Sequence, residues 1–330
     1  MYITIYQLAM RRRMFMKLAT ASLLTVNQNS LGTNHVNAKA EEGIAVRFLG
    51  TGAADWNGRN ERGELRRLTS ILVDRHILID FTPTAEDMLP VDCHPKIIFY
   101  THSHNDHYNP TAALKAGIKQ VYLSYTWYDI AKVDFEKAAK ALNIEAPLIT
   151  PVYIGQQIKI ENLVITPLPA NHATEYSMEQ ALIYLIEKQN TRLLYATDTG
   201  GIPALATCMS GIDAHQKGNP ITALIMEATM GMEYDVDFRL FTHSSVALVE
   251  RTVRILKETK RYLPPAGQPV YITHLARTLH GTQAELDIHL PEPLRAAYDG
   301  LEVVFYPNHF DSFSKTQQDH TICKTKDLHI

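Results

Sequence analysis

A short apolar segment of this chain, residues 96–101, is followed directly by four side chains of the kinds that bind metals: His102, His104, Asp106 and His107. In extended chain, residues two positions apart point the same way, so His102 and His104 can bind one ion. The chain then turns and directs the other two toward a neighbouring position. Imidazole and carboxylate ligands suit zinc, iron and manganese. The pattern predicts a metal centre where a strand ends and a loop begins.

Short β-branched segments separated by turn residues predict a chain rich in strands. The predicted strands are 44–49, 70–73, 77–81, 96–101, 163–168, 181–187, 192–197, 222–227, 269–273 and 301–306. Apolar residues at helical spacing predict helices at 127–142 and 244–262. Two groups of strands with helices between them predict layered sheets covered by helices, of α/β or α+β class. One compact domain, 39–330, is expected.

The N-terminal residues 1–38 have the pattern of a signal peptide, because three arginines precede the apolar stretch 18–26. The segment Arg12-Arg13-Met14-Phe15-Met16-Lys17 resembles the twin-arginine export motif, with Met16 in place of leucine. Cleavage is expected after Ala38. A Sec-type signal, or a translation start at Met10 or Met14, is the alternative. Either export route predicts a periplasmic or secreted protein.

Composition argues against a nucleic-acid partner, because the chain has 32 Lys and Arg and 35 Asp and Glu, which gives a formal net charge of −3. Removing residues 1–38, with four basic and no acidic side chains, makes the charge about −7. No membrane anchor is expected after cleavage, because no other stretch approaches eighteen apolar residues. Cys93, Cys208 and Cys323 are far apart and lack CxxC spacing, which indicates neither a disulfide framework nor a thiolate site. One disulfide between two of these three cysteines, with the third left over, stays an open alternative.

Further candidate residues follow other predicted strands. They are Asp80 in Ile77-Leu78-Ile79-Asp80, His172 in Pro169-Ala170-Asn171-His172, Asp198 in Tyr195-Ala196-Thr197-Asp198, and His274 in Tyr271-Ile272-Thr273-His274. Together with the first cluster, these motifs resemble those of the metallo-β-lactamase superfamily in form and order. The resemblance extends from about residue 44 to residue 310. It implies a four-layer αββα sandwich.

The resemblance also implies the ligand sets of two divalent ions. His102, His104 and His172 would hold one ion, Asp106, His107 and His274 the second, and Asp198 would bridge them. Asp80 would orient the metal loop rather than bind metal. Two ions about 3.5 to 4 Å apart can generate a hydroxide nucleophile near neutral pH, which predicts a hydrolase. Zinc is favoured, with manganese and iron as alternatives. True β-lactamases place cysteine where this chain has Asp198, so antibiotic hydrolysis is disfavoured.

Three more segments resemble the phosphodiesterase branch of the superfamily, which includes RNase Z and the carbon-phosphorus lyase accessory phosphodiesterases. They are Leu49-Gly50-Thr51-Gly52, Glu227-Ala228-Thr229 and Thr242-His243-Ser244-Ser245. The predicted catalytic residues are Asp106, Glu227 and His243. His243, before a helix with Ser244 as its expected N-cap, would donate a proton to the leaving alkoxide. The alternatives are a capping or surface role for His243 and an ordinary buried acid for Glu227.

A small anionic phosphodiester, such as a cyclic phosphate or a nucleotide fragment, is the expected substrate. The tRNA-gripping arm of RNase Z has no room in the 25 residues between His172 and Asp198, so neither tRNA nor a duplex is expected. A carbon-centred hydrolase for a lactone, thioester or amide, and a non-catalytic metal-binding protein, are the alternatives. Substrate contacts by Arg66, Arg67 or His280, and a homodimer, also stay open.

Overall fold

The computed structural model describes residues 43–213 and 219–308 of the 330-residue chain. The predicted signal peptide, 1–38, and Cys323 lie outside these residues. No helix in the described part of the chain is long and apolar enough to cross a membrane. Cys93 is a buried, free thiol.

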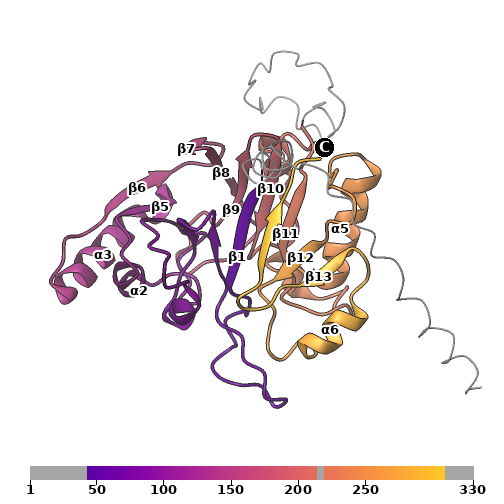
Figure 1. The fold of residues 1–330 in the computed structure, drawn as a ribbon, viewed down its shortest axis with the longest axis horizontal. Coiled ribbons are helices and arrows are strands. Elements are labelled where there is room, and N and C mark those ends of the chain that lie inside the picture. Colours follow the sequence, from indigo (N-terminus) through magenta and orange to yellow (C-terminus); the bar gives the residue numbers. More distant parts are fainter. Residues whose placement is uncertain (1–42, 214–218, 309–330) are drawn as a thin grey trace, which may run out of the picture. The chain divides into compact units, whose positions relative to one another are not determined.

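Two seven-stranded sheets form the centre of the described fold (Figure 1). The first has the order β14-β1-β2-β3-β4-β5-β6, with β14 Glu302–Phe305, β1 Ile44–Gly50, β2 Ser70–Val73, β3 Ile77–Ile79, β4 Ile97–Phe99, β5 Gln120–Ser124 and β6 Leu148–Val152. The second has the order β13-β12-β11-β10-β9-β8-β7, with β13 Leu294–Ala296, β12 Val270–Thr273, β11 Ala223–Glu227, β10 Thr191–Ala196, β9 Leu182–Lys188, β8 Leu163–Pro169 and β7 Ile158–Ile160. Strands β3 to β6 run parallel, and so do β10 to β13.

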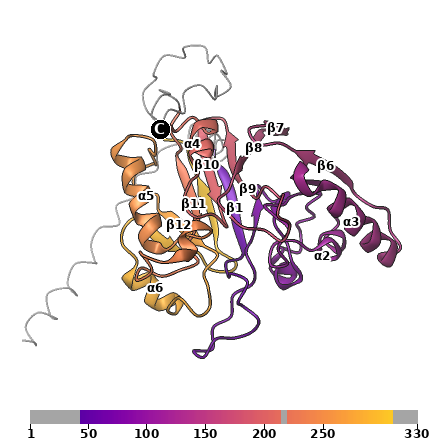
Figure 2. The same cartoon turned by 180° about the vertical axis from the view of Figure 1, so that it is seen from behind.

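Helices cover the outer face of each sheet, as Figure 2 shows from behind. The first sheet carries α2 (Pro110–Lys115), α3 (Tyr128–Leu142) and the 3-10 helices η1 (Pro83–Met88) and η2 (Tyr125–Trp127). The second carries α4 (Ala204–Met209), α5 (Val246–Glu258) and α6 (Gln283–His289), and η3 (Phe238–Phe241) precedes α5. The predicted four-layer αββα sandwich is confirmed.

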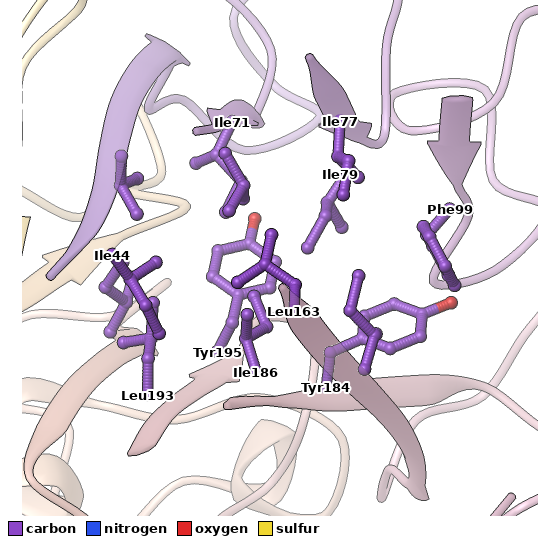
Figure 3. Packing of buried hydrophobic residues seen from close by; sticks show 14 of the residues in the cluster. Ile44, Ile71, Ile77, Ile79, Phe99, Leu163, Tyr184, Ile186, Leu193 and Tyr195 are labelled. Carbon is purple, nitrogen blue, oxygen red and sulfur yellow. The ribbon is translucent and has the colours of Figure 1, made fainter. Parts of the chain in front are cut away.

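Alternation along the strands divides the apolar side chains between two interfaces. Ile71 and Val73 face the second sheet, whereas Leu72 between them packs against the helices. The cluster between the sheets includes Ile186 and Tyr195, which Figure 3 shows with side chains from both sheets. Burial of both faces of each sheet makes the register of the strands well specified, because a slip of one residue would reverse every side chain.

The predicted elements agree with the observed ones to within a few residues, with one exception in detail. Helix α5 begins at Val246 and its N-cap is Ser245, whose hydroxyl accepts a hydrogen bond from Leu248 N, so the expected cap at Ser244 is wrong. Ser244 instead donates to the carbonyl of Thr199 at 2.8 Å. The prediction also missed the strands β5, β6, β7 and β13 and the helices α2, α4 and α6. Strands β7 and β13 have three residues each, and the three helices have six or seven, which is too short for a clear periodic pattern.

Truncation of Ile186, which is fully buried between the sheets, tests this packing. Ile186→Ala is expected to cost about 3 kcal/mol of unfolding free energy, because it removes apolar contacts and leaves a cavity. Thermal melting should fall by roughly 10 °C. The matched control is Ile288→Ala, at a side chain 76% exposed, which should melt like the parent protein. Equal melting of both variants would contradict the assignment of the core.

Candidate metal centre

Most of the predicted site residues meet because they follow strands that run in parallel, whereas His172 follows the antiparallel strand β8 and His243 lies between η3 and α5. Asp80 and the loop beginning at His102 come after β3 and β4. Asp198, Glu227 and His274 lie at the ends of β10, β11 and β12. The carboxyl ends of parallel strands share one edge of a sheet, which is where open α/β sheets bind ligands. A distance of 2.9 Å from His107 Nε2 to Asp198 Oδ2 shows that the two edges meet.

Three of these residues have a left-handed backbone that non-glycine residues rarely adopt. The φ angles are 56° at Asp80, 49° at Asp198 and 56° at His274. Such conformations cost of order 1 kcal/mol each and persist where surrounding contacts impose them. Here each one ends a strand and turns its side chain into the centre. Strain at three converging side chains is typical of a functional site.

Three histidines form the first ligand group. His104 Nδ1 lies 2.9 Å from His102 Nε2 and 3.2 Å from His172 Nε2, and the three nitrogens lie within 4.8 Å of one another. Burial, together with the charge of His107, holds the pKa of His102 well below its usual range. Its neutral imidazole is the form that binds a metal.

Asp106, His107 and His274 form the second group. His107 Nε2 lies 3.2 Å from Asp106 Oδ2 and 3.3 Å from His274 Nε2. Asp198 lies between the groups, because its Oδ2 is 3.3 Å from His274 Nε2 and its Oδ1 is 3.8 Å from His172 Nε2. The two groups therefore have the membership expected from the sequence motifs. Their nitrogen and carboxylate donors fit two divalent cations that share the Asp198 carboxylate.

Hydrogen bonds on the opposite side of each ring fix which nitrogen carries the proton. The Nδ1 atoms of His102 and His274 donate to the hydroxyls of Thr101 and Thr229, both at 2.9 Å. These hydroxyls accept, because each donates its own proton to a buried carboxylate: Thr101 to Asp80 at 2.7 Å and Thr229 to Glu227 at 2.5 Å. The Nδ1 of His172 donates to the carbonyl of Thr242 at 3.1 Å. The Nε2 atoms are thus left unprotonated and free to bind metal.

Asp80 holds the metal loop at three points. Its carboxylate accepts from Thr101 N at 2.8 Å, from the Thr101 hydroxyl, and from His107 Nδ1 at 2.8 Å. Asp80 is fully buried, and burial raises its pKa although the His107 charge and these hydrogen bonds oppose the rise. The position agrees with the orienting role expected for Asp80.

His243 and Glu227 lie beside the second group. His243 Nδ1 is 3.2 Å from Glu227 Oε1 and 3.6 Å from Asp198 Oδ1. Burial lowers the pKa of His243, but the charges of Glu227, Asp198 and Asp106 outweigh it and raise the pKa to about 9. Glu227 is fully buried and also accepts from Thr199 N at 2.6 Å. Glu227 thus contacts His243, Thr199 and Thr229, and its predicted catalytic role stays a prediction.

The sequence patterns did not indicate Glu179. Its carboxylate accepts from Ser103 N at 2.8 Å and from the Ser103 hydroxyl at 2.5 Å, which ties down the loop between His102 and His104. Nothing in the sequence singles out Glu179, because it lies 76 positions from its partner and outside any motif. Thr101 and Thr229 stand next to predicted residues, so their roles could have been anticipated.

The two arginines have partners within the protein. Arg66 is buried and donates to Thr51 Oγ1 and the carbonyl of Ala297, both at 2.8 Å. Arg67 pairs with Asp87 and Asp299. Both guanidinium groups are thus engaged within the protein, and substrate contact by either stays an open prediction.

The Gly-rich turn supports the loop of His274. Leu275 N donates to the carbonyl of Thr51 at 2.9 Å, and the indole of Trp56 donates to the carbonyl of Leu275 at 2.7 Å. A Cβ on Gly52 would lie 2.5 Å from the Trp56 ring, and one on Gly50 would lie 2.0 Å from the carbonyl oxygen of Leu68. Glycine is required at both positions by close packing, whatever the substrate.

Residues 75–274 match the family model of the beta-lactamase superfamily domain. The chain therefore belongs to this superfamily. Most members are metal-dependent hydrolases that bind divalent ions. A comparison with curated protein sequences finds no significant match.

Three solved structures with a similar fold each match about four fifths of this chain. A diphosphatase of the PhnP family has a TM-score of 0.53 and 21% identity, over 80% of this chain and 97% of that one. Zinc-bound PqqB from Methylobacterium extorquens has a TM-score of 0.56 and 14% identity, over 78% of this chain and 99% of that one. The metallo-beta-lactamase fold protein YhfI from Bacillus subtilis has a TM-score of 0.53 and 15% identity, over 79% of this chain and 99% of that one. At these identities the likeness shows the fold alone.

Replacing Asp80 tests how the metal loop is held. In Asp80→Asn, the amide can offer a proton to His107 Nδ1, which would move the ring proton to Nε2 and block that ligand. Metal affinity is expected to fall about 10- to 100-fold, measured by competition with a chelator. Asp92→Asn, at a side chain 77% exposed, is the matched control. Unchanged affinity in Asp80→Asn would contradict the orienting role.

His280 provides a test of pH dependence. Its Nε2 donates to the carbonyl of Ala228 at 2.7 Å, and burial lowers its pKa from 6.5 to about 4. As the pH falls, His280 is protonated in the unfolded chain before it is protonated in the folded one. The stability that neutral His280 contributes to the folded state is therefore complete above pH 6.5 and is lost on acidification toward pH 4. His280→Gln keeps a donor without titrating. Between pH 7 and pH 5, the parent should lose about 2 kcal/mol more stability than the variant. Parallel stability curves would contradict this.

Proposed function

We propose that this protein is a two-metal phosphodiesterase that hydrolyses a small phosphodiester. The observation that carries the proposal is His243, which stands beside the bridging Asp198 and is backed by the buried carboxylate of Glu227. His243 also belongs to two groups of side chains that could hold a metal, one with His172 and Asp198 and one with Glu227 and His274, so the metal content of a His243 variant distinguishes a ligand from a proton donor. Two divalent ions, zinc favoured and manganese or iron as alternatives, would supply a nucleophile at neutral pH and neutralise charge on the reacting phosphate.

His243 has the position of a proton donor. Its side chain is 23% exposed, while those of His172 and His274 are each 3% exposed, so substrate can reach the ring. Nδ1 faces Glu227 and Asp198, which leaves Nε2 for the substrate. Glu227 favours the protonated ring, and a protonated ring can donate to the leaving oxygen. Asp106 contributes charge to the same side of the centre, 3.4 Å from His274.

The segment between His172 and Asp198 consists of one loop and the strands β9 and β10, which leaves no room for an inserted tRNA-binding arm. This supports a small substrate. The acidic net charge would repel tRNA and duplexes. We propose that the reaction takes place in the periplasm or outside the cell, after twin-arginine export. A lactonase, thioesterase or amidase on the same metal ligands is the second candidate, since the fold alone does not choose the reacting atom.

Removing His243 tests the proposed proton transfer. His243→Ala should lower kcat/KM about 100-fold for a 2′,3′-cyclic nucleotide, whose leaving group is an alcohol that needs a proton. The loss should be smaller for a nitrophenyl phosphodiester, because nitrophenolate leaves without help. Metal content per chain should not change.

His289→Ala, at an exposed histidine at the end of α6, is the matched control and should keep parental rates. Equal losses with both leaving groups would remove His243 from the proton transfer. Turnover of lactones with no turnover of either phosphodiester would favour the second candidate instead.

A further inference from the structure

Ser103 separates the ligands His102 and His104, and both of its polar donors meet one carboxylate. Ser103 N donates to Glu179 Oε1 at 2.8 Å, and the Ser103 hydroxyl donates to Oε2 at 2.5 Å. Two charge-assisted bonds from one residue to one carboxylate fix its orientation as well as its position. A shift of Ser103 would move the histidines on either side, whose ring nitrogens lie 2.9 Å apart.

Glu179 belongs to a part of the chain that is itself held in place. Gln180 N donates to Thr126 Oγ1 at 2.9 Å, and Leu182 N, at the start of β9, donates to the carbonyl of Thr101 at 2.9 Å. The Glu179 carboxylate therefore links a fixed segment beside the second sheet to the metal loop of the first. A group that is locked by its own hydrogen bonds can hold a neighbouring ligand precisely.

The segment 173–178, between His172 and Glu179, contributes little packing of its own. Most of its side chains are exposed, and none of these described residues belongs to a buried apolar cluster. Before this segment, Asn171 N donates to Thr199 Oγ1 at 2.9 Å. The position of His172 relative to the metal loop therefore depends on the two ends of the segment, and Glu179 forms one of them.

A carboxylate is the side chain that suits this position, because it offers one acceptor oxygen to each donor of Ser103. The glutamine side chain has a single acceptor oxygen, and its NH₂ group would face a donor. A shorter or apolar side chain would leave both donors unsatisfied. The hydrogen bonds of Ser103 thus depend on the chemical identity of Glu179 as well as on its place in the fold.

We propose that Glu179 is a positioning residue of the metal centre and sets the affinity for the ion held by His102, His104 and His172. Glu179 itself belongs to none of the side-chain groups that could hold a metal among the described residues. It acts on the backbone between two ligands. The inference rests on the two-ion centre of the proposed function but not on the reaction, because it concerns metal binding alone.

The effect of Glu179 is expected to fall mainly on this first ion, because the second group has supports of its own. His107 Nδ1 is held by Asp80 at 2.8 Å, and His274 Nδ1 is held by Thr229 at 2.9 Å. Neither contact involves Ser103 or Glu179. Loss of the carboxylate should therefore separate the affinities of the two ions instead of lowering both together.

Titration of the full metal-free chain with Mn²⁺ tests this role. Glu179→Ala should weaken the binding of one ion about tenfold or more and change the other less than about threefold. Glu179→Gln, which keeps one acceptor oxygen, should lie between Glu179→Ala and the parent. Glu145→Ala, at an exposed glutamate, is the matched control and should bind both ions as the parent does.

His104→Ala, which removes a ligand of the first group, identifies the affected ion. Adding Glu179→Ala to this variant should leave the affinity for the remaining ion unchanged, because the two changes act on the same site. Equal weakening of both ions, or parental affinities in Glu179→Ala, would overturn the positioning role alone. Binding of a single ion by the parent chain would reject the two-ion centre and this role with it, whereas an inactive protein that binds two ions would reject only the proposed reaction.

Discussion

The centre depends on one buried carboxylate, Asp80, whose charged partner among the residues that the structure describes is the ring of His107. Its oxygens accept from the Thr101 backbone, the Thr101 hydroxyl and His107, and each bond does a separate task. The first fixes the start of the metal loop, the second makes the hydroxyl an acceptor for His102, and the third holds the His107 proton on Nδ1. A buried carboxylate with its acceptor sites filled is tolerable, whereas one left unpaired is costly. The loop and the carboxylate therefore stabilise each other.

Glu227 repeats this arrangement at the end of the other sheet. It accepts from Thr229, whose hydroxyl in turn accepts from His274, as Thr101 does for His102. Each sheet thus supplies a buried carboxylate, a threonine and a histidine in a row, and the two rows meet at Asp198. Each carboxylate also contacts a second histidine, which is the ligand His107 at Asp80 and His243 at Glu227. In the proposed reaction, the contact to His243 is the one through which Glu227 affects the chemistry.

The fold class could be predicted from local patterns, and the resemblance to the superfamily implied which side chains lie together in the two ligand groups. Strand ends at Asp80, Asp198 and His274 follow apolar runs, and parallel strands bring their ends to one edge whatever the loops do. Contacts between distant side chains could not be read this way. Glu179 accepts hydrogen bonds from Ser103 without any motif, and the N-cap of α5 is Ser245 rather than the predicted Ser244 because its hydroxyl is the one that accepts from Leu248 N.

The two ligand groups are proposed to hold two ions joined by Asp198. This proposal is tested by titration of the metal-free chain with Mn²⁺, followed by electron paramagnetic resonance. We expect two ions to bind per chain and the spectrum to become that of an exchange-coupled pair, because two ions sharing a carboxylate lie about 3.5 to 4 Å apart. Saturation at one ion per chain, or two ions with uncoupled spectra, would contradict it.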